Sequence, residues 1–161
     1  MNFFAFSALI NGITSSALGI FVFLRNPKGV VNRYYALTTL FMGIWSYGYF
    51  FWQISLYENQ ALFWCRVLMV GAIFIPVTYL HFVLSLLGKH HQKKYLLIVN
   101  YIIASIFLLL DFTPFFVKGV SPKLFFRYWP EAGISYFTFL LLGYGFCITY
   151  ALALMIKAYQ K

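Results

Sequence analysis

The sequence has very few acidic side chains. Only three of its 161 residues are Asp or Glu, and they are spread along the chain as Glu58, Asp111 and Glu131. A pair of carboxylates within one helix, which would serve general acid–base catalysis, is therefore excluded. The chain also lacks the H-E-x-x-H, G-x-S-x-G and P-loop motifs of common enzyme classes. We predict that it is not an enzyme and that it needs no cofactor.

Cysteine and charge are scarce as well. Cys65 and Cys147 both lie in apolar stretches, which excludes a disulfide scaffold. Charged residues make up 9% of the chain, whereas a soluble domain carries about 25%. Hydrophobic residues make up 63%, so the chain has too little polar surface to cover itself in water. These proportions predict a membrane protein.

Five apolar stretches are long enough to cross a hydrocarbon core of about 30 Å. They are predicted at residues 3–24, 35–54, 62–87, 95–110 and 134–156. The third is longer than a span needs, so we expect it to tilt or protrude, and Pro76 should kink it. Residues 111–133 contain too many charges for a sixth span and are predicted to form an outer loop on the membrane surface. The predicted fold is an all-α, polytopic transmembrane helix bundle that forms one domain over residues 1–161.

Basic residues are concentrated in alternate connections. Only three occupy the 111–133 loop, whereas eight occupy the first and third connections and the C-terminal tail: Arg25, Lys28, Arg33, Lys89, Lys93, Lys94, Lys157 and Lys161. Because Lys and Arg in short loops resist translocation, we predict an N-terminus outside and a C-terminus in the cytoplasm of a multi-pass cell-membrane protein. No positive segment precedes the first apolar stretch, so that stretch is expected to remain in the mature protein.

The net charge of +9 bears on the expected partners. The basic residues lie in short gaps between apolar stretches and do not share one polar face, so we do not expect nucleic acid as a partner. Anionic lipid headgroups at the cytoplasmic connections are the expected partners.

Arg66 is the only basic residue inside a predicted span, near the outer end of the third. One interpretation is structural: the side chain extends to the interface or pairs with Glu58 or Asp111. The other is functional: Arg66 lies in a cavity that opens outward beside Trp64 and Trp52 and binds an anionic or carbonyl-bearing ligand. We also expect Arg66 to lie close to Asp111, because the third and fourth spans run in opposite directions.

Histidines offer a second candidate. His81 lies near the cytoplasmic end of the third span, where it is either an ordinary interfacial residue or a pH sensor, because an unperturbed imidazole titrates near pH 6.5. His90 and His91 are adjacent in a lysine-rich connection and leave most metal coordination positions unfilled, so no metal site is predicted.

Small and polar residues inside the spans indicate how the helices pack. Ser15-x-x-x-Gly19 and Gly143-x-x-x-Cys147 place small side chains on one face of their helices, which permits close approach. Asn11 and Asn100 are expected to face other helices, since a polar group at membrane depth needs a hydrogen-bond partner.

Several segments, taken in order, resemble a known family. They are Asn32-Arg33, Tyr35-Ala36-Leu37, Ile44-Trp45-Ser46-Tyr47-Gly48-Tyr49, the stretch Q-A-L-F-W-C-R-V-L at 60–68, G-A-I-F-I-P-V at 71–77, His81-Phe82-Val83-Leu84 and Tyr128-Trp129-Pro130-Glu131-Ala132-Gly133. Together they are similar to the N-terminal seven-transmembrane region of bacterial sensor histidine kinases, and the resemblance covers the first five helices of that region.

The resemblance implies a sensory role. In that family the membrane region is the input module, so the chain is expected to receive a ligand or membrane signal for a two-component system. The chain departs from the family in having five predicted spans and no phospho-acceptor or ATP-binding domain. It is therefore expected to be part of a longer sensor or a short relative that works with a kinase module or as a homodimer. The alternative is a non-signalling binding or assembly subunit of other membrane proteins.

Overall fold

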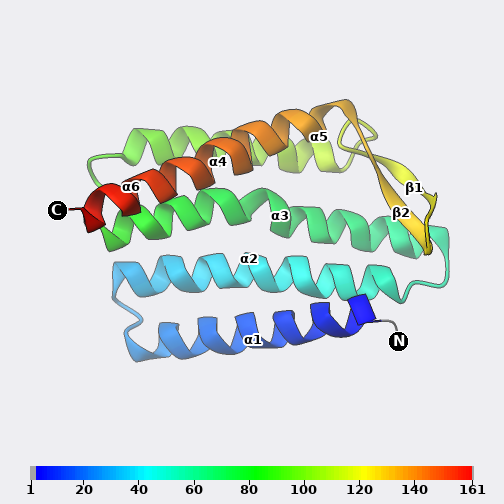
Figure 1. Cartoon of the computed structure of the whole chain (residues 1–161), viewed down its shortest axis with the longest axis horizontal. Helices are drawn as coiled ribbons and strands as arrows, with labels where there is room; N and C mark the ends of the chain where they lie inside the picture. The colour runs from blue at the N-terminus through cyan, green and yellow to red at the C-terminus, as the bar shows by residue number, and fades with distance from the viewer. Residues whose placement is uncertain (1–2, 161) are drawn as a thin grey trace.

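A computed structural model describes residues 3–160 of the chain. Four long helices come first, and a β-hairpin and a further long helix follow (Figure 1). The four helices are α1 (Phe3–Arg25), α2 (Val30–Gln53), α3 (Glu58–Leu86) and α4 (Lys94–Asp111). The hairpin consists of β1 (Val117–Lys123) and β2 (Phe126–Ala132). The final segment, which we call the last helix, runs through α5 (Ile134–Phe139), the π-helical η1 (Leu140–Ile148) and α6 (Thr149–Tyr159).

The helices carry the apolar surface expected of a membrane bundle. Within residues 3–160, four are long and apolar enough to cross a membrane: α1, α3, α4 and the last helix. The helix α2 is also long, with 24 residues. It lies between α1 and α3 (Figure 1) and includes polar residues such as Asn32 and Arg33. The predicted bundle of membrane helices is confirmed in outline, and the fifth span stays a prediction.

Glycines allow α2 and α3 to pack very closely. A Cβ on Gly71 would lie 2.5 Å from the backbone nitrogen of Trp45, and one on Gly48 would lie 2.7 Å from the backbone nitrogen of Leu68. Only a residue without a side chain fits at such distances. In α1 the predicted small-residue pair Ser15 and Gly19 is buried. Small residues therefore permit close helix packing between α2 and α3 as well as on α1.

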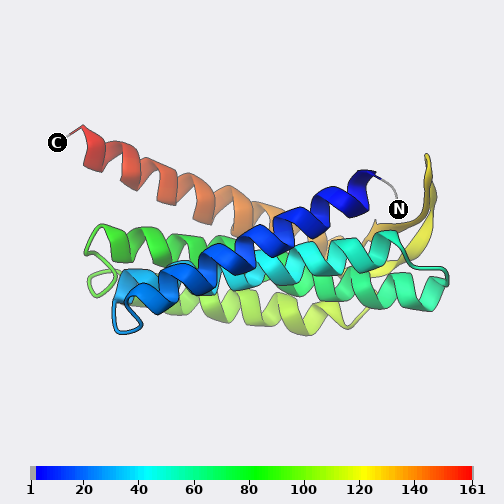
Figure 2. The same cartoon turned by 90° about the horizontal axis from the view of Figure 1, so that it is seen from below.

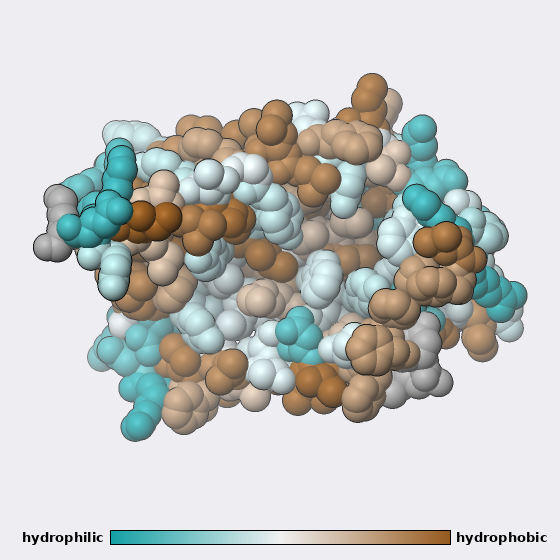
Figure 3. All heavy atoms as spheres, viewed as in Figure 1, coloured by the Kyte–Doolittle hydropathy of each residue, from teal (hydrophilic) through white to brown (hydrophobic). Residues whose placement is uncertain are grey.

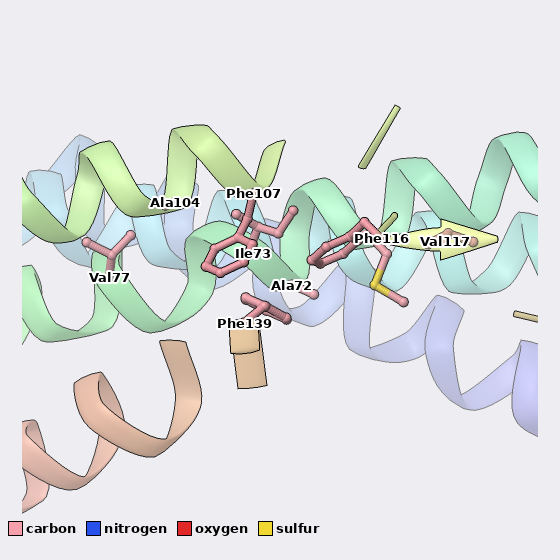
Figure 4. Packing of buried hydrophobic residues seen from close by; sticks show 9 residues of the cluster. Ala72, Ile73, Val77, Ala104, Phe107, Phe116, Val117 and Phe139 are labelled. Carbon is pink, nitrogen blue, oxygen red and sulfur yellow. The ribbon is translucent and has the colours of Figure 1, made fainter. Parts of the chain in front are cut away.

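A second core lies where α3, α4, the hairpin and the last helix meet (Figure 4). Phe107 of α4 packs against Phe116 and Phe139, with ring centroids 6.1 Å and 5.6 Å apart. Ile73 and Val77 of α3 complete the contact. The core fixes the start of the last helix against the middle of α3.

The segment 111–133, which the sequence predicts to be an outer loop on the membrane surface, contains regular β-structure. It forms an antiparallel hairpin in which Ser121 pairs with Trp129 and Lys123 pairs with Phe126. The hairpin is held to the helices by Trp52, whose Nε1 donates a hydrogen bond of 2.6 Å to the carbonyl of Tyr128. The all-α prediction is wrong for this segment. It has β-branched and aromatic residues on both sides of a turn, and the two strands satisfy each other's backbone hydrogen-bonding groups by pairing.

Polar residues are found mainly at the two ends of the bundle, and hydrophobic residues cover much of the surface between them (Figure 3). The N-terminus, the turn between α2 and α3, and the hairpin share one end, which we call the hairpin end (Figure 1). The other two helix connections and the C-terminus share the opposite end, which we call the basic end (Figure 1). Of the basic residues predicted to be cytoplasmic, Lys161 lies outside the described residues.

The last helix diverges from the other helices toward its C-terminal end (Figure 2). Its large side chains are mostly exposed, including Leu141 and Ile156, whereas Cys147 and Ala151 are buried against α3 and α4. The last helix therefore has the most exposed side-chain surface in the C-terminal half of the bundle.

Candidate functional site

A pocket of about 390 Å³ lies between the first half of α3 and the C-terminal end of α4. Its wall is largely apolar, with three polar side chains, Asn59, Arg66 and Asp111. The apolar lining residues are Leu62, Phe63, Val67, Val70 and Phe112. Pockets for small ligands have this character, a mainly apolar wall with a few placed polar groups.

The helical period of α3 explains which residues form this wall. Asn59, Leu62, Arg66 and Val70 recur at intervals of three and four, which places them on one face of the helix. Asp111 is the last residue of α4 and faces them from the other side of the pocket. The antiparallel order of α3 and α4 thus brings Arg66 and Asp111 to the same depth.

Asp111 is buried without a hydrogen-bond partner in the part of the chain that the structure describes. Its side chain is 0% exposed, and neither carboxylate oxygen has a hydrogen-bond partner within residues 3–160. The buried Nε of Arg66 also lacks a partner. Arg66 and Asp111 line the same pocket, yet no hydrogen bond joins the two side chains. The pocket therefore has an unsatisfied acceptor on one wall and an unsatisfied donor on the other.

This arrangement costs stability. A buried polar group without a partner loses its hydration and gains nothing in return, at about 1–3 kcal/mol and more for a charge. A purely structural ion pair would bring the two groups into contact. Two charged side chains that share a pocket without pairing are instead typical of a site whose partner is a ligand.

The two tryptophans of the predicted cavity lie elsewhere. Trp52 is buried under the hairpin, with its ring 5.7 Å from that of Trp129. Trp64 stacks on Phe51 of α2 at 4.4 Å. Neither lines the pocket of Arg66, so the expectation that the four side chains share one cavity is corrected. The physical reason is that α3 turns by about 100° per residue, which directs Trp64 toward α2 and Arg66 toward α4.

His81 joins three helices. Its ring stacks on Tyr34 of α2 at 3.4 Å, and its Nδ1 lies 3.2 Å from the hydroxyl of Tyr101 in α4. The side chain is half-buried, so it is not a freely hydrated interfacial residue. A proton on His81 would place a charge between two tyrosine rings, and its role as a pH sensor stays a prediction.

One polar contact links α3 to the last helix. Pro76 has no backbone N–H, so the carbonyl of Ala72 has no donor from its own helix. The hydroxyl of Tyr144 donates a hydrogen bond of 3.2 Å to that carbonyl. Tyr144 lies in the π-helical segment η1, and such segments occur frequently at functional sites. The sequence signal was the proline itself, which frees the carbonyl four residues earlier.

The polar residues predicted to face other helices have found partners. The amide nitrogen of Asn11 donates to Ser46 of α2 at 2.6 Å, and the thiol of Cys147 donates to the amide oxygen of Asn100 at 3.2 Å. These contacts join α1 to α2 and α4 to the last helix. We assign them to packing.

The comparisons with known proteins identify the family. A family model described as the N-terminal 7TM region of histidine kinase matches residues 7–161. The chain belongs to this family. No curated protein and no solved structure matches it.

Membership in the histidine kinase 7TM family confirms the resemblance drawn from the sequence segments. The family describes the N-terminal membrane region of histidine kinases and not their catalytic domain. The match covers α2, α3, α4, the hairpin, the last helix and most of α1. The pocket of Arg66 and Asp111 and the contact of Tyr144 with Ala72 therefore both lie within the region that defines the family.

Proposed function

We propose that the chain is a ligand-receiving sensory module of a bacterial signal-transduction protein of the histidine kinase type. The observation that supports this most directly is Asp111, whose fully buried carboxyl group has no hydrogen-bond partner within residues 3–160 and lies on the wall of a pocket that Arg66 also lines. A group kept at a cost in stability is expected where binding supplies the missing contacts.

The contacts of α3 suggest how the signal passes through the bundle. Arg66 and Pro76 lie on the same helix, and Tyr144 of the last helix donates to the carbonyl that Pro76 frees. A ligand that favours one position of α3 relative to α4 would shift the population of last-helix positions. The last helix then carries the change to the basic end.

The alternative function is a non-signalling assembly subunit of other membrane proteins. The exposed apolar face of the last helix, with Leu141 and Ile156, is the observation that favours it. A homodimer through the same face is a further proposal. A static subunit would need no population shift, and this difference is open to experiment.

Orientation and partners complete the proposal. The position of α2 between α1 and α3 supports a fifth membrane crossing. The basic end then faces the cytoplasm, as its lysines and arginines favour, and it contacts anionic lipid headgroups and a kinase module. The hairpin and the Arg66 pocket face outward.

Labelling with a cysteine reagent that cannot cross the membrane tests this orientation. We expect the reagent to reach a cysteine at Ser121 (Ser121→Cys) and not one at Gln92 (Gln92→Cys) in intact cells. The native Cys65 and Cys147 are buried, so the parent protein supplies the background. Labelling of Gln92→Cys alone would show the opposite orientation.

Spin-label distances test the sensory role. Labels at Gln92 and Gln160, both exposed at the basic end, report the position of the last helix. We expect Asp111→Leu to change the ratio of two distance populations by about fivefold, because a difference of about 1 kcal/mol between two arrangements has that effect. Double electron–electron resonance in lipid nanodiscs measures the distances.

A matched variant controls for the added leucine. Ser105 is exposed on the same helix, α4, so Ser105→Leu should leave the distances as they are. Unchanged distances in Asp111→Leu would contradict the sensory proposal and favour the static subunit. Asp111→Leu should also be at least as stable as the parent protein, since replacing buried charges with apolar groups is often neutral or stabilising.

A further inference from the structure

We infer that the pocket between α3 and α4 binds a zwitterionic amphiphile, whose head group carries both an ammonium and an anionic oxygen. The inference rests on the proposed function and specifies the ligand that the sequence left as an anion or a carbonyl. The new observation is that both carboxylate oxygens of Asp111 and the Nε of Arg66 lack hydrogen-bond partners within residues 3–160, while both side chains line the same pocket.

Neither a simple anion nor a simple cation suits both walls. An anion that accepts a hydrogen bond from Arg66 brings no donor for the carboxylate oxygens of Asp111, and it is repelled whenever Asp111 is ionised. A cation that donates to Asp111 would be repelled by Arg66 in the same way. A head group with both charges gives each side chain a partner. Charge-assisted hydrogen bonds of this kind are stronger than hydrogen bonds between neutral groups.

The rest of the wall favours an apolar chain on the ligand. Leu62, Val67 and Val70 line the pocket on α3, and the exposed rings of Phe63 and Phe112 also contribute to its wall. Its volume of about 390 Å³ falls in the range of small-molecule sites. Burial of the chain supplies affinity, while the two charged side chains select the head group.

Two sources offer this chemistry, and they can be told apart. One is a free amphiphile, such as a 2-amino fatty acid. The other is a membrane lipid with an ammonium headgroup, such as phosphatidylethanolamine. Phosphatidylcholine is the matched lipid for the negative control, because its quaternary nitrogen has no N–H to donate.

A series of ten-carbon amphiphiles tests the inference on the full chain in phosphatidylglycerol nanodiscs. Decanoic acid carries only the anion, decylamine only the cation, and 2-aminodecanoic acid both. Ligands that bind the folded state raise the melting temperature, which tryptophan fluorescence records. We expect 2-aminodecanoic acid to reach half its effect at a concentration about tenfold lower than either singly charged compound, since one additional charge-assisted contact accounts for such a factor.

The lipid source is tested in the same assay without added amphiphile. If the ligand is a lipid, replacing part of the phosphatidylglycerol with phosphatidylethanolamine should raise the melting temperature, and phosphatidylcholine should not. If the ligand is a free amphiphile, the two lipids should behave alike while 2-aminodecanoic acid remains effective. Either pattern supports a zwitterionic head group.

Variants assign the effect to the pocket. Asp111→Leu and Arg66→Gln should each remove the preference for the zwitterion, whereas Arg127→Gln, at an exposed arginine of the hairpin, should retain it. Equal responses to all three amphiphiles together with equal responses to both lipids would overturn the inference, and so would a preference that survives Asp111→Leu.

Failure of the ligand class and failure of the sensory role give different results. If Asp111→Leu shifts the spin-label distances but no zwitterion is preferred, the sensory role stands and the ligand class is wrong. If the zwitterion is preferred but the distances do not respond to it or to Asp111→Leu, the ligand class stands and the sensory role is wrong.

Discussion

Gly71→Ala is expected to destabilise the bundle by about 2–3 kcal/mol, the upper part of the range for overpacked cores. The added Cβ would lie 2.5 Å from the backbone nitrogen of Trp45 and 2.6 Å from the carbonyl oxygen of Phe41. Backbone atoms of α2 cannot move aside as the end of a flexible side chain does. The helices α2 and α3 must therefore separate, and every contact along their interface weakens. Unfolding in mixed micelles with increasing denaturing detergent measures the free energy.

A glycine elsewhere in a helix provides the control. A Cβ on Gly145 would meet only ordinary contacts, the nearest being 3.6 Å from the carbonyl oxygen of Leu140. Gly145→Ala should therefore cost nothing measurable, and it removes the entropy penalty of a helical glycine. Equal stabilities of Gly71→Ala and Gly145→Ala would show that α2 and α3 do not pack as described.

Trp52→Ala is expected to cost about 3–5 kcal/mol and to release the hairpin, as large-to-small substitutions of buried aromatic residues do. Trp52 is 4% exposed, its ring stacks with Phe126 and meets Trp129 edge-on, and its Nε1 donates to the carbonyl of Tyr128. Its removal leaves a cavity and an unsatisfied carbonyl together. Hydrogen exchange of residues 117–132 measures the release of the hairpin.

An exposed aromatic residue of the same hairpin gives the comparison. Phe125 is 72% exposed, so Phe125→Ala should leave hydrogen exchange in β1 and β2 close to that of the parent protein. Trp52→Phe keeps most of the apolar contact and loses only the hydrogen bond, and we expect it to cost about 1 kcal/mol. Slow exchange in Trp52→Ala would mean that the hairpin is held by other contacts.

The resemblance to the family was available from the sequence because it depends on the order of short segments. Asn32-Arg33, the Trp64-Cys65-Arg66 stretch and the Ile75-Pro76 step are local features that need no tertiary information. The family match over residues 7–161 confirms them. Arg66 also stood out by itself, since a charge inside an apolar span is costly and therefore rare.

The sequence by itself determined that this is a helical membrane protein, because a chain with 63% hydrophobic residues and 9% charged residues has to satisfy its backbone hydrogen bonds within helices. Only the tertiary structure decided which groups lack partners. Composition does not reveal that residues 117–132 pair as a hairpin, that Trp64 faces α2 while Arg66 faces α4, or that Tyr144 donates to the carbonyl of Ala72. Nor does it reveal that Asp111 is buried in a pocket between α3 and α4 with no hydrogen-bond partner within residues 3–160. That pocket is set by packing between segments distant in the chain, which no local pattern records.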